Sequence, residues 1–274
     1  MDFATKILEA TGKGYVSYSA LKYAADGSRS QDMKLFELYM TGRLKKDSPA
    51  LTFGSLYDAM LLEPETLNAR FTLLDDSEIV AELKDSYKNP KLSGPYKAWK
   101  KEQDEKIAGG NLTIVSQGDW DMAEKMIARL DASEVANPIT GEIVPVRHYL
   151  TGKVQHEINS WIGDIPVRGF LDCISEENGF ISDSKSTRSI HGFRYDVGSF
   201  CYDIQAYIYT QVMGTNDFYW VVQEKTSPYL CGVYKASDRS LASGEQKFWT
   251  AIANINQWLE NGGNTASFAL SGEI

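Results

Sequence analysis

Three charged residues on two short apolar segments form the strongest candidate for a chemical site in this sequence. Asp172 lies in the first segment, and Asp183 and Lys185 lie in the second, within VRGFLDCISEENGFISDSKS. Carboxylate oxygens suit Mg²⁺ and Mn²⁺, which usually keep several waters and accept phosphate oxygens, and a nearby lysine can orient or deprotonate an attacking water. The pattern therefore indicates a metal-dependent phosphodiesterase site. The alternative is a surface hairpin with an ordinary Asp/Lys pair.

The segments around these residues predict two adjacent antiparallel strands. Ile165–Ile174 and Phe180–Lys185 are rich in β-branched and aromatic residues, and the polar SEENG between them is typical of a hairpin connection. Side chains alternate across a strand, so Asp183 and Lys185 share one face, and Asp172 can reach that face from the neighbouring strand. We therefore expect the three charges to converge.

Asp58 is a second candidate, because it is the only charge between residues 48 and 62, in a segment otherwise suited to a buried helix. A buried carboxylate is costly unless it is paired or binds a cation. Asp58 is therefore either a metal ligand or a partner in a structural salt bridge.

Gln205 and Tyr209 form a third candidate, in FCYDIQAYIYTQVMG. Residues four apart on a helix share a face, and an amide with a phenol can bind a phosphate or the edge of a base. The alternative is that the tyrosines of this helix are core or interface residues.

Composition sets outer limits on the function. The chain has 274 residues, 43% of them hydrophobic, and a net charge of −9, which argues mildly against indiscriminate nucleic-acid binding without excluding a nuclease. No apolar run has membrane-spanning length and the start lacks the layout of a signal peptide, so we expect a cytoplasmic protein with no membrane partner. The scattered Cys173, Cys201 and Cys231 fit a reducing compartment and argue against an iron–sulfur cluster.

The elements that position these residues change in type once along the chain. Residues 1–136 are predicted to be mostly helical, and residues 137–274 to carry the sheet and its flanking helices, together forming a single domain of mixed α/β (α+β) class. The predicted helices are Ser17–Ala25, Met33–Thr41, Ser48–Leu62, Tyr96–Ile107, Ser116–Leu130, Phe200–Met213 and Ser240–Leu259, and a further strand pair is predicted at Phe218–Gln223 and Tyr229–Lys235.

Taken together, these segments resemble one family. The opening YVSYSALKYA, the helix FGSLYDAMLLEPE, the core RGFLDCI and GFISDSKST, the QAYIY helix and the pair FYWVVQEKTSPYLCGVY are similar to the exonuclease VIII (RecE-type) branch of the PD-(D/E)XK nuclease superfamily. The resemblance covers most of the chain. It implies a restriction-endonuclease-like core, with a central mixed sheet flanked by helices.

The resemblance also implies roles for individual residues. Asp172 and Asp183 would bind the metal, Lys185 would be the catalytic lysine, and Gln205 and Tyr209 would lie near the metal and the DNA. The family usually has a histidine where this chain has Asp58, and a carboxylate there remains a competent ligand for a hard metal ion.

Three further acids are left open. Glu157 either faces the same site or is an exposed strand residue, and a helix acid such as Asp121 or Glu124 is a further candidate ligand, since some relatives use one there.

The function implied by the resemblance is a Mg²⁺-dependent exodeoxyribonuclease, with Mn²⁺ able to substitute. It would degrade double-stranded DNA from an end in the 5′ to 3′ direction, giving single strands for recombination. A phage or prophage origin, a ring-shaped homo-oligomer and a single-strand annealing partner are implied in the same way. The alternatives are a structure-specific or sequence-specific endonuclease of the same fold and a non-catalytic DNA-binding or assembly protein.

Overall fold

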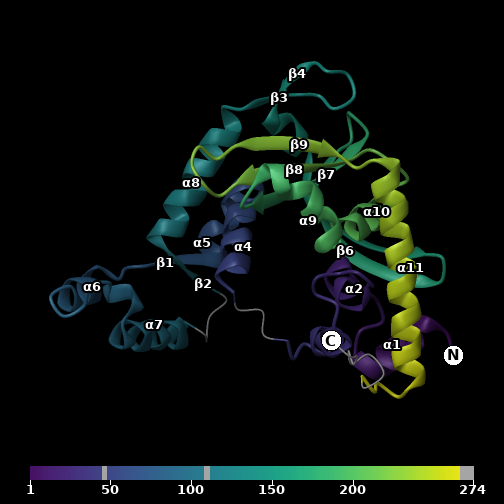
Figure 1. The fold of residues 1–274 in the computed structure, drawn as a ribbon, viewed down its shortest axis with the longest axis horizontal. Coiled ribbons are helices and arrows are strands. Elements are labelled where there is room, and N and C mark those ends of the chain that lie inside the picture. Colours follow the sequence, from purple (N-terminus) through teal and green to yellow (C-terminus); the bar gives the residue numbers. More distant parts are fainter. Residues whose placement is uncertain (45–47, 108–111, 266–274) are drawn as a thin grey trace, which may run out of the picture. The chain divides into compact units, whose positions relative to one another are not determined.

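The computed structural model describes residues 1–44, 48–107 and 112–265, which belong to two compact units (Figure 1). The first unit joins residues 1–46 to residues 130–274, and the second comprises residues 47–129. The single nuclease domain expected from the sequence stays a prediction.

A five-stranded mixed sheet forms the centre of the first unit. Its strand order is β5-β6-β7-β8-β9, and every neighbouring pair is antiparallel except β7 and β8. A parallel pair needs a crossover connection, and here the chain between β7 and β8 contains two helices, α9 and α10. The strands are β5 (Lys153–Ile162), β6 (Ile165–Ser175), β7 (Phe180–Thr187), β8 (Phe218–Glu224) and β9 (Cys231–Lys235). The predicted antiparallel hairpin of the two charged segments is confirmed as β6 and β7.

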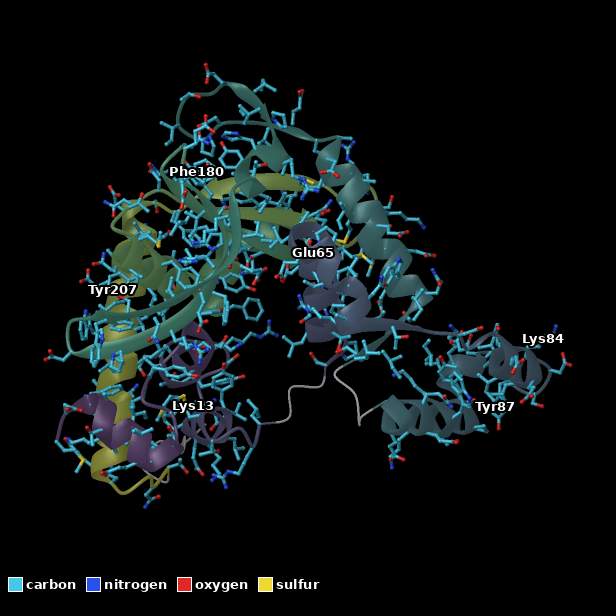
Figure 2. The ribbon with its side chains drawn as sticks, turned by 180° about the vertical axis from the view of Figure 1, so that it is seen from behind. Lys13, Glu65, Lys84, Tyr87, Phe180 and Tyr207 are labelled. Atoms are coloured by element: carbon cyan, nitrogen blue, oxygen red, sulfur yellow. The ribbon has the colours of Figure 1, made fainter. Side chains whose placement is uncertain are left out.

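Residues of β7 alternate between two packed faces, as the period of a strand requires. On one face the Phe180 ring lies 5.5 Å from the Tyr149 ring, and the Ser182 hydroxyl donates to the Tyr149 carbonyl. On the other face Ile181 joins the main hydrophobic core and Asp183 bonds to a residue of α10. Figure 2 labels Phe180, and also Tyr207, a residue of α10 whose ring lies 5.5 Å from that of Phe248 on α11.

Beyond its first three residues, β7 stops pairing with β6. The register between the two strands covers only Ser175–Phe180, Ile174–Ile181 and Cys173–Ser182, whereas β7 pairs with β8 along seven positions, from Ile181 to Thr187. At the point where the β6–β7 ladder ends, the side chain of Asp172 takes its place, with Oδ2 accepting the backbone N–H of Ser184 at 2.8 Å. The two strands therefore fork at the candidate site.

Helices cover the sheet face that carries Asp183. They are α1 (Phe3–Thr11), α2 (Tyr18–Ala24), α3 (Met33–Met40), α9 (Phe193–Ser199), α10 (Tyr202–Met213) and α11 (Asp238–Glu260). The long helix α11, yellow in Figure 1, packs beside α10. Its N-terminus is capped by Ser237, whose hydroxyl accepts from the Ser240 N–H at 3.2 Å. Its buried residues recur at helical spacing and form one apolar stripe: Gly244, Phe248, Ala251, Ile252, Ile255 and Trp258.

The N-terminal segment is joined to the sheet through β6. The Val16 N–H donates to the Pro166 carbonyl at 3.0 Å, and the Val16 carbonyl accepts from the Arg168 N–H at 2.9 Å. This two-bond bridge places the start of α2 beside the strand that carries Asp172, so the first 46 residues belong with the sheet.

The second unit is built around α4, which holds Asp58. Pro49 occupies the first turn, the Ser48 hydroxyl accepts from the Leu51 N–H at 3.3 Å, and the helix ends just before Glu63-Pro64, as predicted. Its elements are α4 (Pro49–Leu62), α5 (Leu67–Arg70), β1 (Phe71–Leu74), α6 (Ser77–Leu83), α7 (Gly94–Ile107), β2 (Thr113–Ser116) and α8 (Gln117–Asp131), which continues into the first unit.

Short elements account for the differences from the sequence prediction. The region expected to be mostly helical also contains the parallel pair β1 and β2, and β3 (Glu134–Ala136), which pairs with β4 (Ile143–Pro145). Helices α1, α6 and α9 were not predicted individually, and α10 begins at Tyr202 because Cys201 has a positive φ of 58°. Strands of three or four residues carry too few side chains for a periodic pattern. None of the helices in the described ranges is both long enough and apolar enough to cross a membrane.

Candidate active site

Asp183 is buried at the centre of the candidate site, with only 2% of its surface exposed. One oxygen, Oδ1, accepts from Nε2 of Gln205 at 2.5 Å, and the other, Oδ2, forms an ion pair with Nζ of Lys185. A buried carboxylate needs such partners because its desolvation is otherwise costly. The prediction that Asp183 and Lys185 share a face is confirmed.

Lys185 is held as an ammonium. Its side chain is 17% exposed, and burial alone opposes the charged form, but the charges of Asp183 and then Asp172 outweigh it and raise the pKa of Lys185. Nζ also donates to the Ser184 carbonyl at 3.3 Å and lies 5.1 Å from the centre of the Tyr202 ring. The lysine therefore supplies a fixed positive charge between the two carboxylates and an aromatic face.

Asp172 reaches the same place from β6, as the alternation of side chains predicted. Besides accepting the Ser184 N–H, it accepts from Nε2 of Gln155 at 3.2 Å through Oδ1. Gln155 lies on β5 with a φ of 47°, and the β5–β6 register has pairs on both sides of Gln155 and Asp172 but none between them. A left-handed glutamine interrupting a ladder beside a charged site is a local strain that the surroundings must hold in place.

One atom of the Gln205 side chain has no hydrogen-bond partner in the described part of the chain. Its amide nitrogen binds Asp183, while its oxygen Oε1 is buried and forms no hydrogen bond with any described residue. A buried acceptor without a donor is costly unless a water or a cation satisfies it. Besides the carboxylates of Asp172 and Asp183, the amide oxygen of Gln205 is thus a third hard oxygen donor, on the side chain that binds Asp183.

Tyr209 lies on the same face of α10 as Gln205 but contacts the backbone of β6. Its hydroxyl donates to the Phe170 carbonyl at 2.8 Å, and its ring lies so close to Gly169 that a Cβ there would be 2.9 Å from Cε1. Burial, and then the charge of Asp183, raise the pKa of Tyr209, so it stays a neutral donor. Tyr209 thus positions β6 next to α10, and its predicted part in DNA binding stays a prediction.

The other predicted acids lie elsewhere or have other partners. Glu157 on β5 is exposed and pairs with Arg168, with Oε1 2.6 Å from Nε. In the second unit, Asp121 accepts from Gln117 and Glu124 accepts from Trp120, both neighbours on α8. Asp58 also belongs to the second unit, on α4, so its share in the site stays a prediction.

The donors at the fork fit a divalent metal ion of the hard class. Asp172 and Asp183 offer carboxylate oxygens, and Gln205 offers a buried amide oxygen. Across the described ranges, no group of three or more His, Cys, Asp or Glu side chains is placed to bind a metal. The first unit would therefore supply few charged ligands, and water and substrate oxygens would complete the coordination of Mg²⁺.

Two residues of the site were missed by the sequence reasoning. Gln155 carries no motif, and only its left-handed backbone, which side-chain pattern cannot predict, brings its amide to Asp172. Tyr202 was considered only as a core or interface tyrosine, although it lies three residues before Gln205 on the same helix and its ring centre is 5.1 Å from Nζ of Lys185. Its spacing of three residues from Gln205 was the available signal.

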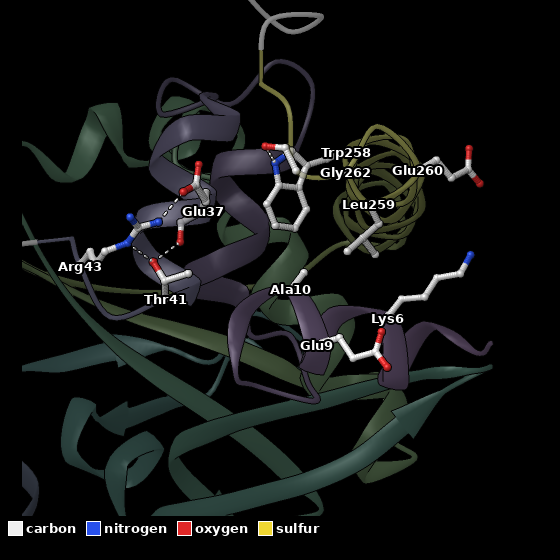
Figure 3. Close-up of a pocket in the computed structure, with 11 residues that line it drawn as sticks. Lys6, Glu9, Ala10, Glu37, Thr41, Arg43, Trp258, Leu259, Glu260 and Gly262 are labelled. Atoms are coloured by element: carbon white, nitrogen blue, oxygen red, sulfur yellow. Dashed lines mark hydrogen bonds and ion pairs between the residues drawn. The ribbon is translucent and has the colours of Figure 1, made fainter.

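A cavity of about 480 Å³ adjoins Gln205 and Tyr209 and extends along β6 past Gly169 to Arg168. A larger hollow of about 630 Å³ lies between α1, α3 and the end of α11 (Figure 3). There Glu37 is paired with Arg43 and with Lys34, and Nε1 of Trp258 donates to the Gly263 carbonyl at 2.8 Å. None of the candidate catalytic residues lines that hollow, so its size does not make it the active site.

The comparisons with known proteins show the family and the fold of the chain. Residues 17–267 match the family model described as a PDDEXK-like domain of unknown function (DUF3799). The crystal structure of a candidate exonuclease from Eubacterium rectale superposes with a TM-score of 0.61 at 16% sequence identity, covering 99% of this chain and 94% of that one.

The remaining comparisons add no argument. The structure of Rai1 from Scheffersomyces stipitis, in complex with 3′-NADP⁺ and calcium, aligns over 97% of this chain and 73% of that one at 12% identity, but its TM-score of 0.25 is too low to indicate a shared fold. No curated protein sequence matches significantly. The predicted restriction-endonuclease-like fold is nevertheless confirmed by the family match, which spans nearly the whole chain. The chain belongs to the PDDEXK-like family DUF3799 of the PD-(D/E)XK superfamily.

Proposed function

We propose that this protein is a metal-dependent deoxyribonuclease that hydrolyses phosphodiester bonds at the fork between β6 and β7. The observation that carries the proposal is the contact network of Asp183, which is buried and bound at once by the Lys185 ammonium and the Gln205 amide, with Asp172 on the adjoining strand. A structural Asp/Lys pair would not need a strained Gln155 to orient a second carboxylate.

In the proposed reaction, water attacks phosphorus and the bond to the 3′ oxygen breaks, leaving a 5′-phosphate on one product and a hydroxyl on the other. Asp172 and Asp183 would hold Mg²⁺, or Mn²⁺ in its place, and Asp58 would assist. When bound, the ion would polarise the phosphoryl group and lower the pKa of a bound water. Lys185 would stabilise the negative charge that builds on the phosphoryl oxygens, or orient the attacking water, because its ammonium is already fixed beside the carboxylates.

The resemblance to RecE-type enzymes supports a more specific proposal. The substrate would be linear double-stranded DNA, degraded from an end in the 5′ to 3′ direction as part of recombination. The same resemblance supports a ring-shaped homo-oligomer, a single-strand annealing partner, and a phage or prophage protein acting in a bacterial cytoplasm. The Eubacterium rectale protein, described as a candidate exonuclease, shares the fold and supports the same class of activity.

The test uses linear duplex DNA with Mg²⁺ or Mn²⁺ and compares the wild type with Lys185→Ala and Asp183→Ala. We expect the wild type to release nucleotides and both variants to lose nearly all activity while keeping their circular dichroism spectra. Arg239→Ala, at an exposed position on α11, is the matched control for loss of a charge.

Two further substrates separate the alternatives. Closed circular duplex has no end, so cleavage of it would favour an endonuclease, and labels on each strand end give the direction of digestion. A wild type that is inert with both metals, or variants that cut as well as it does, would show that the active-site assignment is wrong.

A further inference from the structure

A third cavity, of about 420 Å³, opens where β7 ends, just beyond the catalytic lysine. Its polar lining comes from Arg29, Arg188 and Lys225, and from the hydroxyl-bearing residues Ser186, Thr187 and Ser189. All six belong to the first unit. The proposed function assigns no role to any of them.

The charge in this cavity favours an anion. Arg29 and Arg188 are exposed, and neither forms an ion pair with another residue in the described ranges; the Arg29 guanidinium lies 5.8 Å from the centre of the Phe200 ring. The one carboxylate in the lining, Asp196, accepts from the Thr187 hydroxyl at 3.4 Å. Two arginines that form no ion pair in the described ranges thus line the cavity with one carboxylate, and arginine guanidinium groups match the geometry of phosphate oxygens.

The cavity lies next to the catalytic site and shares Tyr202 with it. Thr187 follows Lys185 by two residues on β7, so it lies on the same face at a rise of about 6.7 Å. Tyr202 lines the cavity and also lies beneath Nζ of Lys185, 5.1 Å from its ring centre. A nucleic-acid strand placed with one phosphate at Lys185 would thus have a neighbouring phosphate within reach of the cavity.

We propose that this cavity binds a backbone phosphate next to the one that is cleaved, with Arg29 and Arg188 as its principal contacts and Lys225 beside them. The inference rests on the proposed function, because it takes the strand to be positioned by cleavage at Lys185. It adds a substrate-binding subsite on the opposite end of β7 from the hairpin turn. The ligand chemistry is a phosphodiester of DNA.

The first experiment measures binding without cleavage. Wild type, Arg29→Ala, Arg188→Ala and the double variant are titrated with a fluorescent linear duplex in EDTA, between 50 and 200 mM KCl. Each phosphate contact contributes about 0.9 to the slope of log affinity against log salt concentration. A variant that loses one contact should therefore have a shallower slope, and raising KCl from 50 to 200 mM should weaken its binding about threefold less than it weakens wild-type binding. Arg239→Ala, exposed and outside the cavity, should keep the wild-type slope.

The second experiment locates the phosphate. Duplexes carrying one neutral methylphosphonate at successive linkages on either side of the cut are digested by wild type and by Arg188→Ala. We expect one linkage adjacent to the cut at which the neutral group slows the wild type several-fold but slows the variant much less. Arg188→Lys, which keeps the charge, should restore part of the wild-type sensitivity.

The outcomes are distinct. Unchanged salt slopes in all cavity variants, or coupling of Arg188 to a linkage far from the cut, would overturn the cavity as a phosphate site. A wild type that never cuts, with slopes that do fall in the variants, would contradict the proposed function while leaving phosphate binding in place. Matching thermal melting curves show whether each variant is folded.

Discussion

Nε2 of Gln205 on helix α10 lies 2.5 Å from Oδ1 of Asp183 on strand β7, so a helix amide fixes the orientation of the buried carboxylate. The other atom of that amide, Oε1, is buried and has no hydrogen-bond donor among the described residues. One side chain therefore both orients Asp183 and offers an unused acceptor beside it.

Substitution of Gln205 should change metal affinity in opposite directions. Gln205→Glu places a second negative group beside Asp183 and should tighten Mn²⁺ binding, whereas Gln205→Leu removes the amide and should weaken it. Gln205→Leu should also cost about 1–3 kcal/mol of stability, because Asp183 loses a buried hydrogen bond. Isothermal titration with Mn²⁺ and urea denaturation measure both effects, and Gln257→Leu, exposed on α11, is the control. Equal Mn²⁺ affinity in the two variants would contradict this role.

Replacement of Gln155 by glycine should destabilise the protein less than replacement by alanine. Both changes remove the contact with Asp172 and should lower the rate of cleavage. Only glycine adopts a φ of 47° without steric strain. Gln155→Gly should therefore be more stable than Gln155→Ala by about 1 kcal/mol, measured by urea denaturation. If alanine is the more stable of the two, the left-handed backbone is not present in solution.

Gly169 and Tyr209 should show energetic coupling. A Cβ on Gly169 would lie 2.9 Å from Cε1 and 3.0 Å from the hydroxyl oxygen of Tyr209, so Gly169→Ala should cost about 1–3 kcal/mol through overpacking. In a Tyr209→Ala background the same change should cost much less, because the colliding ring is gone. A double-mutant cycle by thermal or urea unfolding checks this, and strict additivity would mean that the two residues do not touch.

Metal binding should depend on both carboxylates at the fork. Asp172→Asn and Asp183→Asn should each abolish detectable Mn²⁺ binding in calorimetry, and Asp58→Asn should weaken it if α4 contributes a ligand as proposed. Glu157→Gln is the control, since Glu157 is exposed and paired with Arg168. Full Mn²⁺ affinity in Asp58→Asn would assign that residue to a structural role instead.

Removal of one partner of the ion pair between Asp203 and Lys247 should be strongly destabilising. Asp203 is 2% exposed, and it accepts from Nζ of Lys247 at 2.7 Å and from the Ser243 hydroxyl at 2.8 Å. Lys247→Met leaves a buried carboxylate without its cation and should cost about 3–5 kcal/mol.

The surface pair of Lys235 with Asp217 gives the matched comparison, because both side chains are about a third or more exposed. Lys235→Met should cost at most about 1 kcal/mol. Similar losses in the two variants by urea denaturation would show that Asp203 is not buried in solution.

The charged core of the site was predictable because it depends on the period of a strand. Asp183 and Lys185 are two residues apart on β7, which fixes a shared face, and the polar turn after Ser175 fixes the antiparallel neighbour that carries Asp172. The long helices α4 and α11 were predictable for a similar reason, since their apolar spacing is a local feature, although α11 begins at Asp238, before the predicted start at Ser240.

What could not be predicted depends on contacts between distant segments or on unusual backbone geometry. Arg29 and Arg188 meet in one cavity although they are far apart in the sequence, and no pattern links them. Tertiary packing likewise sets the left-handed backbone of Gln155 and the hydrogen bond from the Tyr209 hydroxyl to the Phe170 carbonyl. The composition of the chain and the spacing of its residues carry no information on these three features.

The fork between β6 and β7 has a spectroscopic consequence. The amide of Ser184 donates to a carboxylate oxygen of Asp172, whereas the amides of a regular strand donate to carbonyls. Its chemical shift and its hydrogen-exchange rate therefore depend on the charge and position of that one side chain. A single resonance of this backbone amide can thus follow the occupancy of the site in solution, without a label on the metal, the substrate or the catalytic residues.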